Sequence, residues 1–176
     1  MSKKLTAFTF LLVALAITLV ASLDWADFWF DVRREWAALA TFVALGALSQ
    51  ALAVDSVVGA AKPVKSSIAF LPLLALAVVY EPPAVVLAAG GMVAINELFV
   101  RPNRSWNRAL FNVSQAILSY GAGAWVFRQV LSWATGDVQL SSGVDIANVF
   151  FPFYTLAVVF FGLNLVLVSM GLAIRE

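Results

Sequence analysis

Residues 84–115 read AVVLAAGGMVAINELFVRPNRSWNRALFNVSQ, and this stretch decides the class of fold. Its first part, 84–100, is almost wholly apolar, and a second apolar segment begins at Ala109. The eight residues between them, 101–108, include three arginines. A helix needs about 17–25 mainly apolar residues to cross the hydrocarbon core of a bilayer. The stretch therefore predicts two membrane-spanning helices joined by a basic connector.

The composition of the whole chain supports the same class of fold. Of its 176 residues, 62% are apolar and 12% are charged, whereas a soluble domain has about 45–50% apolar and about 25% charged residues. A globular fold of this size leaves about a third of its unfolded surface in water, so it cannot hide this much apolar surface. We therefore expect an all-α membrane protein whose single transmembrane domain covers residues 1–176.

Apolar stretches of suitable length recur along the chain. Behind Lys3 and Lys4, the first run exceeds the core of a secretory signal peptide, which has about 7–15 residues, so we expect an uncleaved anchor helix. The prolines at positions 82 and 83 end the third run, because proline cannot continue a helix. The sequence predicts a polytopic bundle of about six transmembrane helices, at about 5–23, 36–54, 66–80, 84–100, 109–133 and 146–174.

The distribution of basic residues predicts the orientation. Cytoplasmic loops of membrane proteins carry an excess of Lys and Arg. With a cytoplasmic N-terminus, six helices place three of the basic residues outside, namely Arg33, Arg34 and Arg128. The other eight lie inside, namely Lys3, Lys4, Lys62, Lys65, Arg101, Arg104, Arg108 and Arg175. We therefore expect both termini in the cytoplasm and a multi-pass protein of the bacterial inner membrane.

The segment 24–36, DWADFWFDVRREW, separates the first two predicted spans. Its apolar residues recur at helical spacing, and its charged residues fill the opposite face. This pattern is typical of a short amphipathic helix that lies in the membrane interface with its rings at headgroup level. Its predicted anchors are Trp25, Phe28, Trp29, Val32 and Trp36. A lid over an outward-facing pocket and a docking surface for a partner are the alternative interpretations.

Polar residues gather around the basic connector, and polar residues inside a membrane are costly unless paired. The candidate cluster consists of Glu97, Arg101, Arg104, Trp106, Arg108, Asn112, Gln115 and, on the sixth helix, Asn164. Positions 108, 112, 115 and 119 share one helical face, and either Asn112 or Gln115 could bind Asn164. The cluster could fix the fourth helix against the fifth, or transmit a change to a cytoplasmic neighbour. Proton transport would need more than one carboxylate.

The chain lacks the residues that several kinds of chemistry require. The chain has no cysteine and no histidine, which excludes disulfides, thiol catalysis, histidine-ligated metals and a Ser-His-Asp triad. It also has no glycine-rich phosphate loop and no paired-carboxylate spacing. We therefore expect no enzymatic activity, no metal and no cofactor. The net charge of +1 gives no indication of a nucleic-acid partner.

The connector and its flanks resemble a known family. Glu97 is followed by Trp106 and Arg108, and then by the Phe111-Asn112 pair and Gln115. This arrangement is similar to the membrane-embedded N-terminal sensor module of bacterial signalling proteins with GGDEF or HD-GYP output domains. A second similarity is the run FFGLNLVLV at 160–168, and the resemblance covers roughly residues 66–174. In that family further helices and an output domain follow, and these 176 residues contain neither.

The resemblance implies a sensor or input module that signals to a cytoplasmic partner. A structural accessory subunit of a larger respiratory or photosynthetic membrane complex is an alternative, which suits the six tryptophans and the amphipathic aromatic segment. A small-molecule-binding subunit of an importer is a further alternative, although the predicted midplane has few convergent polar groups. The expected partners are the lipid bilayer and either other membrane subunits or a second copy of the chain.

Overall fold

The computed structural model describes residues 3–51, 54–56, 64–66, 70–100, 105–135 and 146–175. These ranges contain six α-helices, so the predicted all-α class is confirmed. They also contain one π-helix and a two-stranded ladder that the sequence did not predict. The elements are α1 (Lys3–Ser22), α2 (Ala26–Ala51), β1 (Val54–Ser56), β2 (Val64–Ser66), α3 (Phe70–Val79), α4 (Pro82–Ile95), η1 (Asn96–Val100), α5 (Trp106–Thr135) and α6 (Ile146–Arg175).

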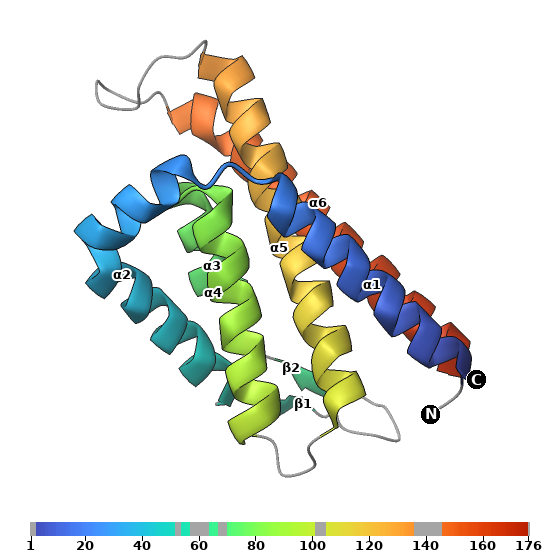
Figure 1. Ribbon diagram of the computed structural model, residues 1–176. Coiled ribbons are helices and arrows are strands. Elements are labelled where there is room, and N and C mark those ends of the chain that lie inside the picture. The colour runs from blue at the N-terminus through green and yellow to red at the C-terminus, as the bar shows by residue number, and fades with distance from the viewer. Residues whose placement is uncertain are drawn as a thin grey trace.

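The helices run up and down between two ends of a bundle (Figure 1). We call the end of the bundle where α1 begins, and where η1 and α6 end, the proximal end. The opposite end is the distal end. The antiparallel ladder, in which Val54 pairs with Ser66, also lies at the proximal end. The distal end carries the α1–α2 junction and the α3–α4 turn. Helix α5 is central, because it packs against α1, α4 and α6.

Helix α2 is bent at Glu35, whose backbone angles (φ −128°, ψ 23°) are not helical. The bend separates the amphipathic segment from the apolar one, close to the boundary expected at residue 36. The two segments were expected as separate helices, and the non-helical Glu35 divides α2 into two helical segments at nearly the expected place. The start of α2 is capped by Asp24, whose Oδ1 accepts a hydrogen bond from the Ala26 N–H at 2.9 Å.

The α3–α4 hairpin turns at Glu81. Helix α4 begins at Pro82, two residues earlier than expected, because proline is tolerated in the first turn, where its missing N–H has no helical partner. Helix α3 starts at Phe70 and has ten residues. This is shorter than the predicted run of 66–80, whose residues 67–69 lie outside the described ranges.

The core lies where α3, α4, α5 and α6 meet. Its most deeply buried apolar side chains are Leu73, Leu76, Val85, Met92, Phe127 and Leu156. Tyr120 of α5 stacks on Phe160 of α6 with ring centroids 4.2 Å apart. The outward face of α6 is apolar and almost wholly uncovered, as expected for a surface that meets lipid.

Three helical segments in the described ranges are long and apolar enough to cross a membrane: Lys3–Ser22, Pro82–Phe99 and Phe150–Ile174. The sequence predicted six. Helix α3 falls short because ten residues rise only about 15 Å, half of the hydrocarbon thickness of about 30 Å. Helix α2 is interrupted by the charged residues around its kink. Helix α5 is long enough, but residues such as Asn112 and Gln115 lower its mean hydropathy.

Candidate functional site

The candidate site begins at the proximal end, where α4 passes into the π-helix η1. Such π-turns are rare and occur frequently at functional sites. Glu97 lies in η1, and only 2% of its surface is exposed. Burying a carboxylate is strongly unfavourable unless it is paired and hydrogen-bonded, so the surroundings of Glu97 must compensate for its lost hydration.

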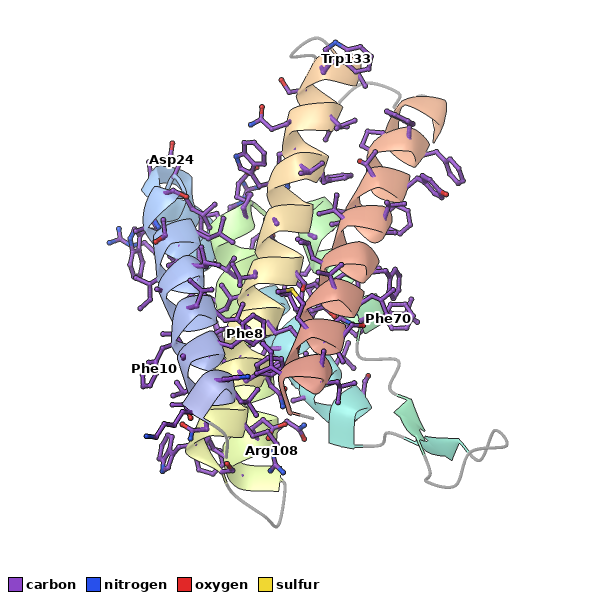
Figure 2. The ribbon with its side chains drawn as sticks, turned by 90° about the vertical axis from the view of Figure 1, so that its right-hand side faces the viewer. Phe8, Phe10, Asp24, Phe70, Arg108 and Trp133 are labelled. Carbon is purple, nitrogen blue, oxygen red and sulfur yellow. The ribbon has the colours of Figure 1, made fainter. Side chains whose placement is uncertain are left out.

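Two side chains of α5 bind the Glu97 carboxylate. Arg108 donates from Nε to Oε2 at 2.9 Å, and Asn112 donates from Nδ2 to Oε1 at 2.8 Å. The two donors are four residues apart and therefore share a helical face. The Arg108 side chain is 37% exposed, and Figure 2 shows it at the opposite end of the bundle from Asp24 and Trp133. The ion pair thus extends from the buried carboxylate to the proximal surface.

The same face of α5 continues towards α6. Gln115 donates a hydrogen bond from Nε2 to Oδ1 of Asn164. One turn further, Ser119 is buried, and its hydroxyl has no hydrogen-bond partner among the described residues. Of the two candidate partners for Asn164, the structure places Gln115 against it. We call Glu97, Arg108, Asn112, Gln115 and Asn164 the polar cluster, which joins η1, α5 and α6.

The remaining three residues predicted for this cluster are Trp106, Arg101 and Arg104. Trp106 is the first residue of α5 and is 73% exposed. An exposed indole at a helix end is typical of the membrane interface. Arg101 and Arg104 lie outside the described residues.

A second polar group, at the distal end, was not predicted from the sequence. Tyr80 donates its hydroxyl proton to Oε2 of Glu35 at 2.8 Å, and the Glu81 carboxylate lies 3.5 Å from Nη1 of Arg128. Because Tyr80 and Glu81 are consecutive, the α3–α4 turn holds both the kink of α2 and the distal part of α5. We call these four residues the distal clamp. From the sequence, only the clustering of charged residues in the predicted outer segments was apparent.

The predicted interfacial anchors separate into two groups. Phe28 is buried and makes edge-to-face contacts with Trp25 and Trp29, each with centroids 5.2 Å apart. Val32 is half-buried and packs against the core. Trp29 and Trp36 are exposed. One side of this segment therefore faces the bundle, while its two outer tryptophans are free to meet a membrane interface.

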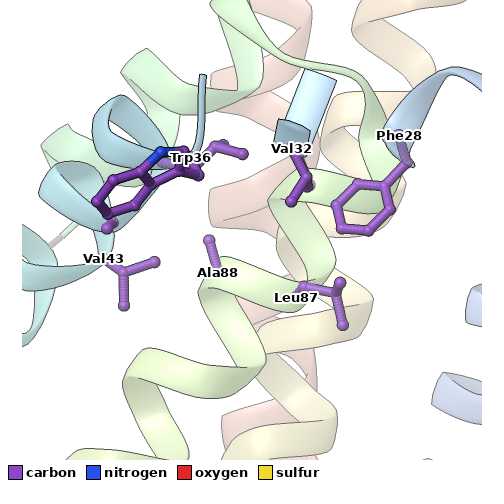
Figure 3. Close-up of a pocket in the computed structure, with 9 residues that line it drawn as sticks. Phe28, Val32, Trp36, Val43, Leu87 and Ala88 are labelled. Carbon is purple, nitrogen blue, oxygen red and sulfur yellow. The ribbon is translucent and has the colours of Figure 1, made fainter. Parts of the chain in front are cut away.

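An apolar groove of about 240 Å³ lies between the kinked helix α2 and α4 (Figure 3). Its lining residues all have apolar side chains: Phe28, Val32, Trp36, Leu39, Ala40, Val43, Ala84, Leu87 and Ala88. Pockets for drug-sized ligands hold about 300–1,000 Å³ and add a few polar groups that orient the ligand. This groove is smaller and has no such group, so it suits an apolar chain better than a polar small molecule.

The chemistry available to the polar cluster is charge pairing and hydrogen bonding. It contains one carboxylate, one guanidinium and three amides, and it has no nucleophile beside a base. In the ranges that the structure describes, no three metal-binding side chains of the His, Cys, Asp or Glu type lie close enough to share an ion. Comparison with protein-family models, with curated proteins and with solved structures gives no match to this chain.

Proposed function

We propose that the chain is a non-enzymatic sensor module of the bacterial inner membrane that signals to a cytoplasmic partner. In this proposal all six helices cross the bilayer and the proximal end faces the cytoplasm. The up-and-down course of the chain supports this proposal, because successive helices alternate in direction, although the ten-residue α3 covers only part of the distance between the two ends. The basic residues Lys3, Lys4 and Arg108 support the orientation, because they belong to the proximal parts of α1 and α5.

The tryptophans also support a membrane location. Trp106 is exposed at the proximal start of α5, and Trp133 is exposed near the distal end of the same helix. Trp29 and Trp36 add two exposed indoles in α2. Indole rings are enriched at both membrane–water interfaces because they are apolar with one polar N–H. Between the two belts, the uncovered faces of α1 and α6 are apolar.

The buried Glu97 of the polar cluster is the observation that carries the signalling role. A sensor needs two arrangements whose populations a ligand or a change of conditions can shift. An ion pair that joins a π-turn to α5 can define two such arrangements, one with the pair formed and one with it broken. Gln115 and Asn164 extend the same cluster to α6, which ends at the proximal side where a cytoplasmic partner would be reached.

Pulsed electron paramagnetic resonance tests this proposal directly. The chain has no cysteine, so Phe99→Cys in η1 and Leu172→Cys in α6, both at exposed positions, accept spin labels without background. In lipid nanodiscs we expect two distance populations whose ratio changes when Glu97→Gln is added. The control is Glu81→Gln at the distal clamp, which should leave the ratio unchanged. A single distribution that neither substitution alters would contradict the proposal.

An accessory subunit is the second candidate function. Its support is the set of exposed aromatic side chains on α6, namely Phe150, Phe151, Phe153, Tyr154 and Phe161, which could pack on another membrane protein. Extraction from the native membrane in a mild detergent separates the two candidates. Stoichiometric co-purification with a large complex would favour the accessory subunit. Recovery as a monomer or homodimer would favour the sensor.

A further inference from the structure

The hydroxyl of Ser119 differs from several other hydroxyl groups on the helices. Thr9, Thr18 and Thr41 each donate a hydrogen bond to the carbonyl oxygen four residues earlier, at 2.7–2.9 Å. Such a bond satisfies the hydroxyl within its own helix. Ser119 is only 1% exposed, and its Oγ has no hydrogen-bond partner among the residues that the structure describes. The Ser119 hydroxyl is therefore buried without the intrahelical bond that the three threonines make.

Ser119 lies near the middle of the proposed membrane span of α5. The exposed Trp106 and Trp133 mark the two ends of this span. Ser119 is about 20 Å from each of them along the helix axis. The centre of a bilayer offers no water to an unpaired polar group, so burying one there is costly. Buried polar groups in proteins nearly always have a partner, and the Ser119 hydroxyl requires one.

Two amide side chains lie next to Ser119 in the polar cluster. Gln115 is one turn nearer the proximal end on the same face of α5, and it donates a hydrogen bond to Asn164 of α6. Residues four apart on a helix have Cβ atoms about 5–6 Å apart. One water molecule with a hydrogen bond of about 2.8 Å on each side spans this distance. Ala116 and Gly123, beside Ser119 on α5, are small residues, so α5 itself leaves room for a molecule of this size.

We propose that one water molecule is bound inside the bundle, between the Ser119 hydroxyl and the amide pair of Gln115 and Asn164. A buried water makes about three hydrogen bonds, and these three side chains supply that number. The water satisfies Ser119 and extends the polar cluster from the proximal surface to the centre of the bilayer. The inference rests on the membrane location proposed above, and it is independent of the signalling role.

Water-edited solid-state NMR of the protein in lipid bilayers tests the proposal. The Cβ atoms of serine and threonine are labelled with carbon-13, and the Ser119 signal is identified by its loss in Ser119→Ala. We expect polarisation to pass from water protons to Ser119 several-fold faster than to Thr9. Thr9 is the control because it is also buried, while its hydroxyl is bonded to the Leu5 carbonyl. Thr9 lies closer to the proximal end, so water from outside the bundle would reach it first.

A matched pair of substitutions tests whether the amides hold the water. Gln115→Leu removes one of its partners and should slow the transfer to Ser119 to the rate seen at Thr9. Gln129→Leu, at an exposed position near the distal end of the same helix, is the control and should leave the rate unchanged. If Gln115→Leu does not fold, the comparison of Ser119 with Thr9 in the wild-type protein still decides the question.

Three results would overturn the inference. The first is transfer to Ser119 as slow as to Thr9, which would mean that the hydroxyl rotates to the carbonyl of Gln115 in its own helix. The second is fast transfer to both residues, which would indicate general hydration of the bundle. The third is an unchanged rate in Gln115→Leu. Polarisation transfer from lipid acyl protons to Thr18, which is exposed on α1, tests the membrane location separately, so the two failures can be told apart.

Discussion

Glu97 is a charged side chain that is almost fully buried, so its lost hydration must be compensated by its neighbours. Its carboxylate is buried, and Arg108 and Asn112 bind it from α5. When one partner of a buried ion pair is removed, the other charge is left without compensation, and this is more unfavourable than replacing both partners. The free energy of unfolding should therefore respond differently to single and double substitutions.

Arg108→Gln should destabilise the protein by about 1–3 kcal/mol, less than for a fully buried pair because Arg108 is 37% exposed. The thermal unfolding midpoint in detergent measures the effect. The double variant Glu97→Gln/Arg108→Gln should recover part of the loss, because no unpaired buried charge remains. The surface substitution Arg34→Gln is the control. A double variant as unstable as the sum of the two single variants would show that pairing is not the cause.

Tyr80→Phe should lower the free energy of unfolding by about 1 kcal/mol, because it removes a hydrogen bond to the Glu35 carboxylate, which is itself partly exposed. The same deletion at Tyr154, which is exposed on α6, provides the control. Both variants can be compared by thermal unfolding in one detergent. Equal midpoints for the two variants would argue against a stabilising distal clamp.

The sequence predicted most of the polar cluster and none of the distal clamp. Glu97, Arg108 and Asn112 stand out because each is polar in or beside an apolar stretch. Whether Asn112 or Gln115 would reach Asn164 depended on helix rotation, which packing sets and periodicity does not reveal. The Tyr80–Glu35 bond joins residues 45 positions apart. No local pattern connects them, so it could not be predicted.

Among the elements, α2 and η1 show what periodicity can and cannot detect. The change from an amphipathic to an apolar pattern near residue 36 predicted two segments, and the bend at Glu35 separates them. The sequence did not reveal that the two segments follow one another directly, with only Glu35 between them. Nor did it reveal the π-turn at Asn96–Val100, because one widened turn hardly alters the spacing of apolar residues over a whole helix.

The close packing of α5 against α1 and α4 depends on Gly121. A Cβ at this position would lie 2.6 Å from Val86 and 2.9 Å from Leu19. Gly121→Ala should therefore destabilise the protein by about 1–3 kcal/mol through overpacking. Gly162→Ala is the matched control, because its Cβ would meet nothing within 4 Å. That variant should be neutral or stabilising by up to about 1 kcal/mol. The thermal unfolding midpoint of Gly162→Ala should equal or exceed that of the wild type.

The whole molecule makes a prediction about sidedness. Single cysteines at Lys4 and Ser105 probe the proximal end, and those at Asp24 and Trp133 probe the distal end; all four positions are exposed. In intact bacterial cells, a maleimide that cannot cross the inner membrane should label only the distal pair. Permeabilised cells should show labelling at all four. Equal accessibility of Lys4 and Asp24 in intact cells would contradict the proposal that α1 crosses the membrane.

The shortness of α3 has a consequence for biogenesis. Ten residues bury too little apolar surface for the translocon to release this helix into lipid by itself. Helix α4 follows after a turn of two residues, and with η1 it forms one of the three segments that are long and apolar enough to cross a membrane. The pair should therefore partition together, as a helical hairpin, during synthesis. A nascent chain arrested before α4 emerges would leave α3 accessible to water, and its later integration would depend on the helix that follows it.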